Sequence, residues 1–183
     1  EPGTASQMTY TDAFYETETE VAYTSANIVL PVIFLLTSPK TVIDIGCGTG
    51  AWAAVAADLG CVVRGVDQDV PPHLQLVPYV DHDLTTGYDC TGYDLAICLE
   101  VAEHLPPEAA EPLVEGLARA DTVLFSAATP GQPGIHHVNC MPHDYWHDLF
   151  ARHHMTPAHV GSLFREPVAD FYCRNMYLYR RES

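Results

Sequence analysis

The sequence VIDIGCGTG, residues 42–50, decides the fold that we expect for this chain. Three of its first four residues are β-branched and apolar, as is typical of a buried strand, and three closely spaced glycines follow. Residues 51–59 are rich in alanine and predict a helix, which Gly60 is suited to end. A glycine loop between a strand and a helix lets the backbone approach a ligand without clashes from Cβ atoms. The stretch therefore predicts a ligand-binding loop.

Strand and helix signals alternate on both sides of this loop. Near-continuous apolar strands between helices indicate a parallel sheet that is covered on both faces. We therefore expect a doubly wound, Rossmann-like α/β fold with a mostly parallel sheet of about seven strands. We find neither repeats nor low-complexity linkers, so residues 1–183 are expected to form one domain, with residues 8–36 as an N-terminal helical cap. The expected strands are 41–45, 61–66, 77–81, 93–99, 122–127 and 175–180, and the expected helices are 10–36, 51–59, 106–120 and 145–152.

Composition narrows the class of function. The net charge is −16 with only eight Lys and Arg, so nucleic acids and anionic membranes are not expected partners. The longest apolar run, residues 28–36, is about half of a membrane-spanning helix, and no signal peptide is recognisable. The six cysteines contain no Cys-x-x-Cys spacing, which favours reduced thiols and a cytoplasmic location. The single lysine, Lys40, excludes a P-loop.

Acidic residues follow several of the predicted strands, where open α/β sheets bind their ligands. Asp44 stands at the end of the first strand, where it can orient the loop and accept a hydrogen bond from a ligand ammonium. Asp67 ends the second strand, 21 positions after Gly46, and can accept hydrogen bonds from both hydroxyls of an adenosine ribose. Asp83 can accept a hydrogen bond from the exocyclic amine of adenine while Leu84 lies against the adenine ring.

These residues resemble the class I S-adenosylmethionine-dependent methyltransferases. VIDIGCGTG is similar to the first motif of that family, Asp67 and Asp83 to its acidic second and third motifs, and LEVAEHL at 99–105 to the motif after the fourth strand. Residues 128–146 resemble a bacterial and phage subgroup of small methyltransferases. The resemblance implies that the cofactor is S-adenosylmethionine. The residues implied to bind it are Asp44, Gly46, Cys47, Gly48, Trp52, Asp67, Gln68, Asp83, Leu84, Glu100 and Val101.

Methyl transfer from a sulfonium is an in-line displacement, so the protein must hold the acceptor against the methyl group and remove a proton where the acceptor requires it. His104 and His137 are the candidates for this base. Tyr15, His136 and Asn139 are the candidates for contact with the substrate. The alternative is that the histidines and Asn139 only tie their loops to the sheet by hydrogen bonds. Trp52 can equally fill the contact between the first helix and the sheet.

Histidines are concentrated in residues 136–159, and His143 and His147 have the spacing of one helix face. Such a pair can hold a divalent metal. Asp144 and Asp148 repeat the spacing, which favours a solvated polar face, so no metal is expected.

The expected function is methyl transfer to a small molecule, such as a sugar or a secondary metabolite. Three alternatives stay open. The bound cofactor can support a cyclisation or another reaction without methyl transfer, or the chain can be a nucleotide-binding subunit without catalysis. Gly46, Gly48 and Ala51 also fit the dinucleotide fingerprint of an NAD-dependent oxidoreductase. The sequence does not indicate the oligomeric state or the methylated atom.

Overall fold

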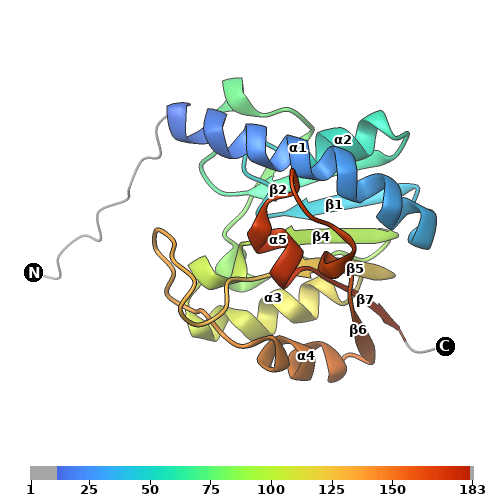
Figure 1. Cartoon of the computed structure of the whole chain (residues 1–183), viewed down its shortest axis with the longest axis vertical. Coiled ribbons are helices and arrows are strands. Elements are labelled where there is room, and N and C mark those ends of the chain that lie inside the picture. The colour runs from blue at the N-terminus through green and yellow to red at the C-terminus, as the bar shows by residue number, and fades with distance from the viewer. Residues whose placement is uncertain (1–11, 182–183) are drawn as a thin grey trace, which may run out of the picture.

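The structure is a computed structural model that describes residues 12–181, with side chains from residue 17 onward. A seven-stranded sheet lies between two layers of helices (Figure 1). The strands are β1 Thr41–Ile45, β2 Val62–Asp67, β3 Tyr79–Asp81, β4 Leu95–Leu99, β5 Thr122–Ser126, β6 Met155–His159 and β7 Tyr177–Arg181. The α-helices are α1 Asp12–Thr37, α2 Ala51–Asp58, α3 Ala110–Leu117, α4 His143–Ala151 and α5 Asp170–Asn175.

The sheet order is β3-β2-β1-β4-β5-β7-β6. The first five strands of this order are parallel, and β7 is antiparallel to both of its neighbours. The chain moves outward from β1 to β3 and then returns to place β4 on the other side of β1. This reversal is a topological switch point, where open α/β sheets bind ligands beyond the carboxyl ends of the strands.

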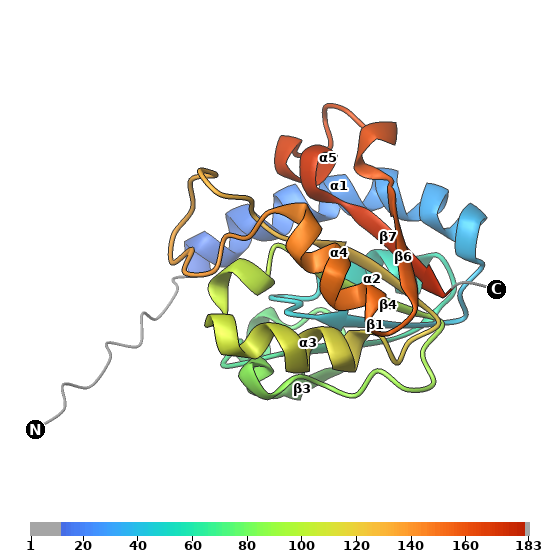
Figure 2. The same ribbon diagram turned by 90° about the horizontal axis from the view of Figure 1, so that it is seen from below.

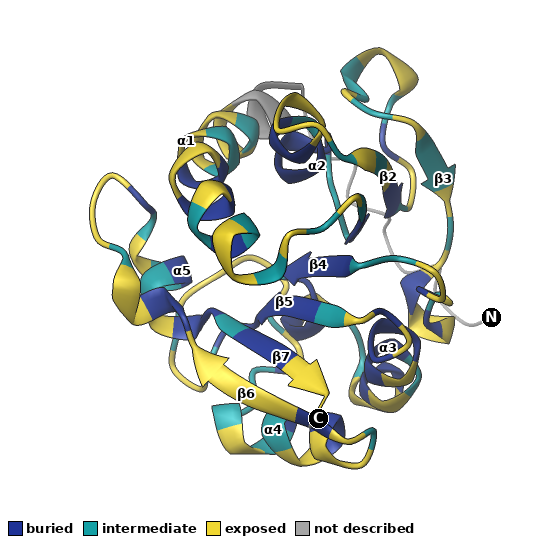
Figure 3. Cartoon of the chain, turned by 90° about the vertical axis from the view of Figure 1, so that its right-hand side faces the viewer, coloured by how far each residue is buried: buried dark blue, intermediate teal, exposed yellow. Residues whose placement is uncertain are grey.

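Two hydrophobic clusters fix the helices to the sheet. Ile43, Ala96 and Phe125 face α3 and α4 on one side, whereas Val42, Ile97 and Leu124 face α1, α2 and α5 on the other. Adjacent residues of a strand point to opposite faces, so strands that are covered on both faces must be apolar at nearly every position. Figure 2 shows α4 and α3 on their face of the sheet, and Figure 3 shows the buried strands between the two layers. The predicted fold class is confirmed.

The sequence prediction missed two elements, β6 and α5. β6 reads MTPAH, and four of its five residues are exposed because it is the outer strand of the sheet. Proline is compatible with an edge strand, but it removes the pattern by which a strand is recognised. In the structure β6 pairs with β7. β7 begins at Tyr177, two residues later than the closing strand that the sequence predicts. α5 has only six residues, too few to show a helical period.

Helix α1 is one continuous helix of 26 residues that passes through Pro31. Residues Thr17–Thr37, with a mean hydropathy of 1.5, are long and apolar enough by composition to cross a membrane. The apolar stretch is thus longer than the run of residues 28–36 predicted. Ala26, Val29, Leu30 and Ile33 are nevertheless fully buried in the cluster that covers the sheet. The helix is therefore a packing element of this domain.

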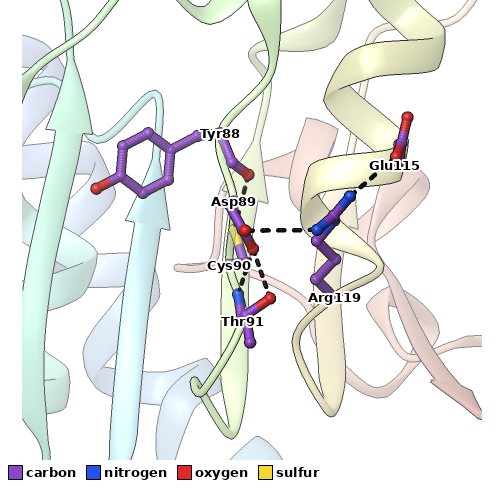
Figure 4. Close-up of polar contacts among 6 residues, drawn as sticks. All are labelled: Tyr88, Asp89, Cys90, Thr91, Glu115 and Arg119. Atoms are coloured by element: carbon purple, nitrogen blue, oxygen red, sulfur yellow. Dashed lines mark hydrogen bonds and ion pairs between the residues drawn. The ribbon is translucent and has the colours of Figure 1, made fainter.

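The segment before β4 is held to α3 by exposed polar contacts (Figure 4). Asp89 accepts hydrogen bonds from the backbone nitrogen and the hydroxyl of Thr91, at 2.9 and 2.6 Å. Arg119 forms ion pairs with Asp89 at 3.4 Å and with Glu115 at 3.0 Å. Exposed ion pairs of this kind contribute at most about 1 kcal/mol each, so they orient the loop more than they stabilise the fold.

Candidate cofactor and substrate site

The glycine loop follows β1 and is tied to the end of β2. The backbone nitrogen of Gly46 donates to the carbonyl of Val66 at 2.8 Å, and that of Gly50 donates to the carbonyl of Cys47 at 2.8 Å. Gly46 and Gly48 have φ of +71° and +53°, a region that favours glycine. A Cβ atom on Gly46 would overlap the side chain of Val101, whereas one on Gly48 would enter open space. The backbone at Gly48 is therefore accessible to a ligand.

Asp67 holds the loop through its carboxylate. One oxygen accepts from the backbone nitrogen of Gly48 at 2.7 Å, and the other accepts from that of Gln68 at 2.7 Å. Burial raises the pKa of Asp67, and the two backbone hydrogen bonds oppose that rise. An ionised carboxylate has about four acceptor positions, so each oxygen can still accept from a ligand hydroxyl. Asp67 stands at the end of β2, as predicted.

Asp44 is buried near the end of β1, with only 3% of the residue exposed. Among the described residues, its Oδ2 has no hydrogen-bond partner. Burial raises the pKa of Asp44 to about 7, the backbone N–H of Ala53 lowers it, and Asp67 raises it further. A buried carboxylate oxygen without a partner is costly, and a ligand ammonium would supply the missing hydrogen bond and charge. Asp44 and the open backbone at Gly48 therefore fit the predicted cofactor.

Two of the predicted cofactor-binding side chains have other neighbours. The Cys47 thiol donates a long hydrogen bond, 3.4 Å, to the carbonyl of Gly48, and burial raises its pKa, so it is a neutral packing group. The Trp52 indole nitrogen donates to the Tyr172 hydroxyl at 3.3 Å, and the two rings meet edge to face at 5.2 Å. Trp52 is thus buried in the hydrophobic cluster on this face of the sheet with its ring against Tyr172 of α5, and its role in cofactor binding stays a prediction.

The residues beyond β3 and β2 lie at the predicted adenine end. Asp83 is exposed and caps the short helix Leu84–Thr86 by accepting from the nitrogen of Thr85 at 2.9 Å. The Thr85 hydroxyl bonds the same Asp83 oxygen, and together they lower its pKa. Leu84 is buried in the core cluster that also contains Val66 and Val80. Its predicted contact with the adenine ring stays a prediction. Gln68 is exposed.

Glu100 begins the loop after β4 in the left-handed region, with φ of +55°. Non-glycine residues adopt this conformation rarely and often at functional sites. Its nitrogen donates to the carbonyl and hydroxyl of Ser126 on β5, at 3.0 and 3.1 Å. Its carboxylate accepts from Gln132 at 3.0 Å and from Asn175 at 3.4 Å. Sequence reasoning missed these two amides because they are 43 positions apart and meet only when β7 returns beside β5.

The predicted bases lie together beyond β4 and β5. His104 ends the short helix Ala102–His104, His137 comes from the loop before α4, and their ring centroids are 5.0 Å apart. Desolvation and then the charge of His137 lower the pKa of His104. Glu103, which sequence reasoning also missed, is fully buried beside them. Burial and the nearby carboxylate of Glu100 raise the pKa of Glu103.

The three predicted substrate contacts have different outcomes. Asn139 is buried, and its backbone nitrogen donates to the carbonyl of Glu103 at 3.0 Å while its amide donates to the carbonyl of Ala102 at 3.5 Å. It therefore fastens the loop, and its contact with the substrate stays a prediction. His136 is exposed, with φ of +57°. The side chain of Tyr15 lies outside the described residues.

The pair His143 and His147 does not offer a metal site. His143 has one ring nitrogen 3.3 Å from the amide oxygen of Asn175 and the other 3.3 Å from the hydroxyl of Tyr177. His147 has its Nδ1 2.7 Å from the hydroxyl of Tyr179. Both nitrogens of His143 and Nδ1 of His147 thus have partners on α5 and β7, and these contacts fasten α4 to the sheet.

A cavity of about 630 Å³ opens on the α1 side of the glycine loop. It is lined by residues of α1, by Thr49, and by the segment after β2 that contains His73, Leu74 and Leu76. Thr19 of α1 and Thr49 bring their hydroxyl oxygens within 2.7 Å of each other at its edge. The cavity borders the loop without including Asp44 or Asp67, so it adjoins the predicted cofactor crevice.

A family model described as a methyltransferase domain matches residues 19–128, more than half of the chain. A ubiquinone biosynthesis O-methyltransferase from Haemophilus ducreyi is 29% identical over 103 residues, which are 47% of this chain and 44% of that protein. The chain thus spans less than half of the length of this curated relative.

Solved structures share the fold across nearly the whole chain. An amino pentose methyltransferase from Micromonospora echinaspora, solved with S-adenosylmethionine, superposes with a TM-score of 0.69 at 15% identity, over 97% of this chain and 100% of that one. Magnesium protoporphyrin IX methyltransferase from Synechocystis, solved with S-adenosylhomocysteine, gives a TM-score of 0.63 at 19% identity, over 98% and 90%. At these identities the likeness establishes the fold.

Proposed function

Because this chain belongs to the methyltransferase domain family of class I, S-adenosylmethionine-dependent type, we propose that it transfers a methyl group from this cofactor to a small molecule. The observation that carries the proposal is the buried carboxylate of Asp44, whose Oδ2 has no partner among the described residues. It lies beside a backbone loop that is open at Gly48. A cationic amino acid ligand fits this combination. An NAD pyrophosphate would meet a negative charge there.

Each part of the site has a defined task in this proposal. Asp44 accepts hydrogen bonds from the ammonium of the cofactor, and Asp67 accepts from the ribose hydroxyls while it keeps its bonds to Gly48 and Gln68. The bound cofactor supplies an electrophilic methyl group on a positively charged sulfur. The residues beyond β4 and β5 hold the acceptor in line with it, which lowers the barrier through positioning. His104 and His137 are the proposed groups that accept the proton of an acidic acceptor.

The acceptor that we propose is a small molecule, either a sugar or an aromatic or other secondary metabolite. The curated relative is named for ubiquinone biosynthesis, and two solved structures that align along their full length are a sugar N-methyltransferase and an amino pentose methyltransferase. The net charge of −16 makes a polyanionic acceptor unfavourable.

Calorimetry on the whole chain tests the cofactor. S-adenosylmethionine and S-adenosylhomocysteine should both bind with one site per chain. Asp67→Ala should weaken the binding by at least about tenfold, because a hydrogen bond to a charged group contributes about 1.5–3 kcal/mol. Asp121→Ala, at an exposed carboxylate directly before β5 and thus at the opposite end of the parallel strands, is the matched control and should leave the affinity unchanged.

Turnover tests the reaction. Incubation with panels of amino sugars and phenols should release S-adenosylhomocysteine together with a methylated product. If neither S-adenosylmethionine nor S-adenosylhomocysteine binds at high micromolar concentration, the proposal is wrong. Conversion of an acceptor without release of S-adenosylhomocysteine would instead identify a reaction that does not transfer the methyl group.

A further inference from the structure

Three side chains with metal-binding atoms converge beyond the carboxyl end of β4. Glu103 and His104 come from the short helix Ala102–His104, and His137 comes from the loop between β5 and α4. Their possible ligand atoms all lie within 4.8 Å of one another. The two segments are more than 30 positions apart in the chain, so tertiary structure brings the three residues together.

Glu103 is the unusual member of this group, because its carboxyl is fully buried. Its exposed fraction is 0%, and within the described part of the chain neither carboxylate oxygen has a hydrogen bond of good geometry, although the backbone nitrogens of Glu103 and Ala128 and the carboxyl of Glu100 lie close to it. Nδ1 of His137 is also buried and has no partner among those residues. Buried polar groups are normally paired, and a buried carboxylate is stabilised by a cation or a metal. The group of possible ligand atoms therefore lies where buried polar atoms lack good hydrogen-bond partners.

The backbone around the group is held independently of these side chains. The nitrogens of Val138 and Asn139 donate to the carbonyl of Glu103 at 2.8 and 3.0 Å. The amide of Asn139 reaches the carbonyl of Ala102 at 3.5 Å. These bonds hold His137 beside Glu103 and His104, and hydrogen bonds from the His104 ring to the backbone at His136 and Ile135 orient that ring. Such a scaffold is what a preorganised metal site requires.

We propose that Glu103, His104 and His137 bind one divalent transition-metal ion. A mixed set of one carboxylate and two imidazoles suits Mn²⁺, Fe²⁺, Co²⁺ or Zn²⁺, whereas Mg²⁺ and Ca²⁺ prefer oxygen ligands alone. Three protein ligands leave coordination positions open, the pattern of metal sites that act on a substrate. The carboxylate of Glu100 lies close enough to interact with that of Glu103, and it adds negative charge beside the ion. The sequence pattern had led us to expect no metal.

The position of the ion is informative if the proposed methyl transfer holds. Val101, between Glu100 and this group, packs over Gly46 of the glycine loop. The metal would therefore lie beside the cofactor crevice, on the side of the acceptor. It would bind a hydroxyl of the acceptor and favour loss of its proton to water, as metal ions do for bound water. His104 and His137 would then be ligands of the metal, and this role replaces their role as bases.

Metal titration of the whole chain tests the site without any cofactor. After removal of metals by a chelator, Co²⁺ should bind with one equivalent and give the visible absorption of a protein-bound ion. Mn²⁺ should bind with the same stoichiometry by electron paramagnetic resonance, and a large excess of Mg²⁺ should displace it poorly. Glu103→Gln and His137→Gln should each weaken the binding by at least about tenfold, because even outer-shell changes have effects of that size.

His147→Gln is the matched control, because it removes a histidine from the rival pair on α4 and should leave the affinity unchanged. His104→Gln provides a further variant at an exposed position, where the fold is preserved more easily. The absence of a one-equivalent Co²⁺ signal would overturn the proposal, as would an equal loss of binding in His147→Gln. If no metal binds, Glu103 would be a neutral acid hydrogen-bonded to Glu100. Glu103→Gln would then keep this hydrogen bond and leave the stability of the fold unchanged. Calorimetry with S-adenosylmethionine on the metal-free chain separates this result from a failure of the proposed function.

Discussion

Two aspartates on either side of one loop differ in what the protein already supplies to them. Asp67 receives two backbone hydrogen bonds, whereas one oxygen of Asp44 receives none from the described residues. Asp67 therefore has a structural role in addition to any ligand, and Asp67→Ala should loosen the glycine loop. Asp67→Asn keeps an acceptor for the nitrogen of Gly48, so it should keep more of the fold than of the affinity. Thermal unfolding measured beside calorimetry separates these two effects.

The raised pKa of Asp44 predicts that cofactor binding depends on pH. The pKa rises from 3.8 to about 7, mainly through burial, and an ammonium ligand binds the ionised form. Affinity for S-adenosylmethionine should therefore fall about tenfold for each pH unit below about 7. Calorimetry between about pH 5.5 and pH 7 should detect this change. Asp44→Asn should bind weakly at every pH, and a dependence of the same slope in that variant would assign the effect to another group.

The same residue predicts how stability of the ligand-free protein depends on pH. Folded Asp44 keeps a proton that the unfolded chain releases above its ordinary pKa of 3.8. The folded state thus binds more protons between about pH 4 and pH 7, so the free energy of unfolding attributable to Asp44 falls as pH rises through this window. Urea unfolding at both ends of the window checks this contribution. It should be absent in Asp44→Asn, and identical pH profiles of the two proteins would contradict it.

Residue types and their positions after strands were enough to predict the acids of the site, but not their surroundings. Asp44 and Asp67 follow apolar runs that the sequence makes plain. The surroundings of Glu103 depend on the loop at Val138 and Asn139, and the contact of Gln132 with Asn175 depends on the return of the chain through α5 to β7, neither of which a local pattern records. Trp52 and Asn139 were assigned to ligands because of their neighbours in sequence, which do not record that Trp52 meets Tyr172 of α5 or that Asn139 bonds the carbonyl of Ala102.

At the scale of elements, the loop between β1 and α2 allows a matched pair of glycine substitutions. Gly48 and Gly60 both have positive φ, +53° and +96°, and a Cβ atom at either would meet no atom within 4 Å. Gly48→Ala and Gly60→Ala should each lose about 1–2 kcal/mol of stability from backbone strain. Only Gly48→Ala should also weaken S-adenosylmethionine binding, because its Cβ enters the crevice. Equal affinities of the two variants in calorimetry would show that the cofactor does not approach Gly48.

The packing of α4 on the sheet depends on one aromatic cluster. Phe125 of β5 is almost fully buried, and its ring lies 5.3 Å from those of Trp146 and Phe150 and 6.2 Å from that of Tyr179. Phe125→Ala should lower the free energy of unfolding by about 3–5 kcal/mol through lost burial and a cavity. Leu163→Ala, at a residue that is 62% exposed, should change it by less than about 0.5 kcal/mol. Urea unfolding of both variants provides the comparison.

Elements with strong apolar periodicity were predictable, and elements whose form is imposed by neighbours were not. The strands β1, β4 and β5 are buried on both faces and read as continuous apolar runs. β6 is recognisable only by its pairing with β7, since its sequence contains Pro157 and exposed residues. The predicted helix over 106–120 is shorter in the structure, because Pro106 and Pro107 precede a 3₁₀ turn before α3 begins at Ala110.

At the scale of the whole molecule, the net charge of −16 predicts a response to salt. Like charges repel one another in the compact state, and salt screens charges that are separated by more than about 10 Å at 0.1 M. The melting temperature at neutral pH should therefore rise when sodium chloride increases from about 20 to about 300 mM. Differential scanning calorimetry measures this shift. A melting temperature that falls with salt would indicate that favourable ion pairs outweigh the repulsion.

The two outer strands determine where the sheet ends. β3 has only three residues, and β6 contains Pro157, which has no amide hydrogen to offer to a further strand. Molecules of this protein are consequently poor templates for joining edge to edge into fibrils. Neither border of the sheet therefore invites another copy of the chain to extend the ladder.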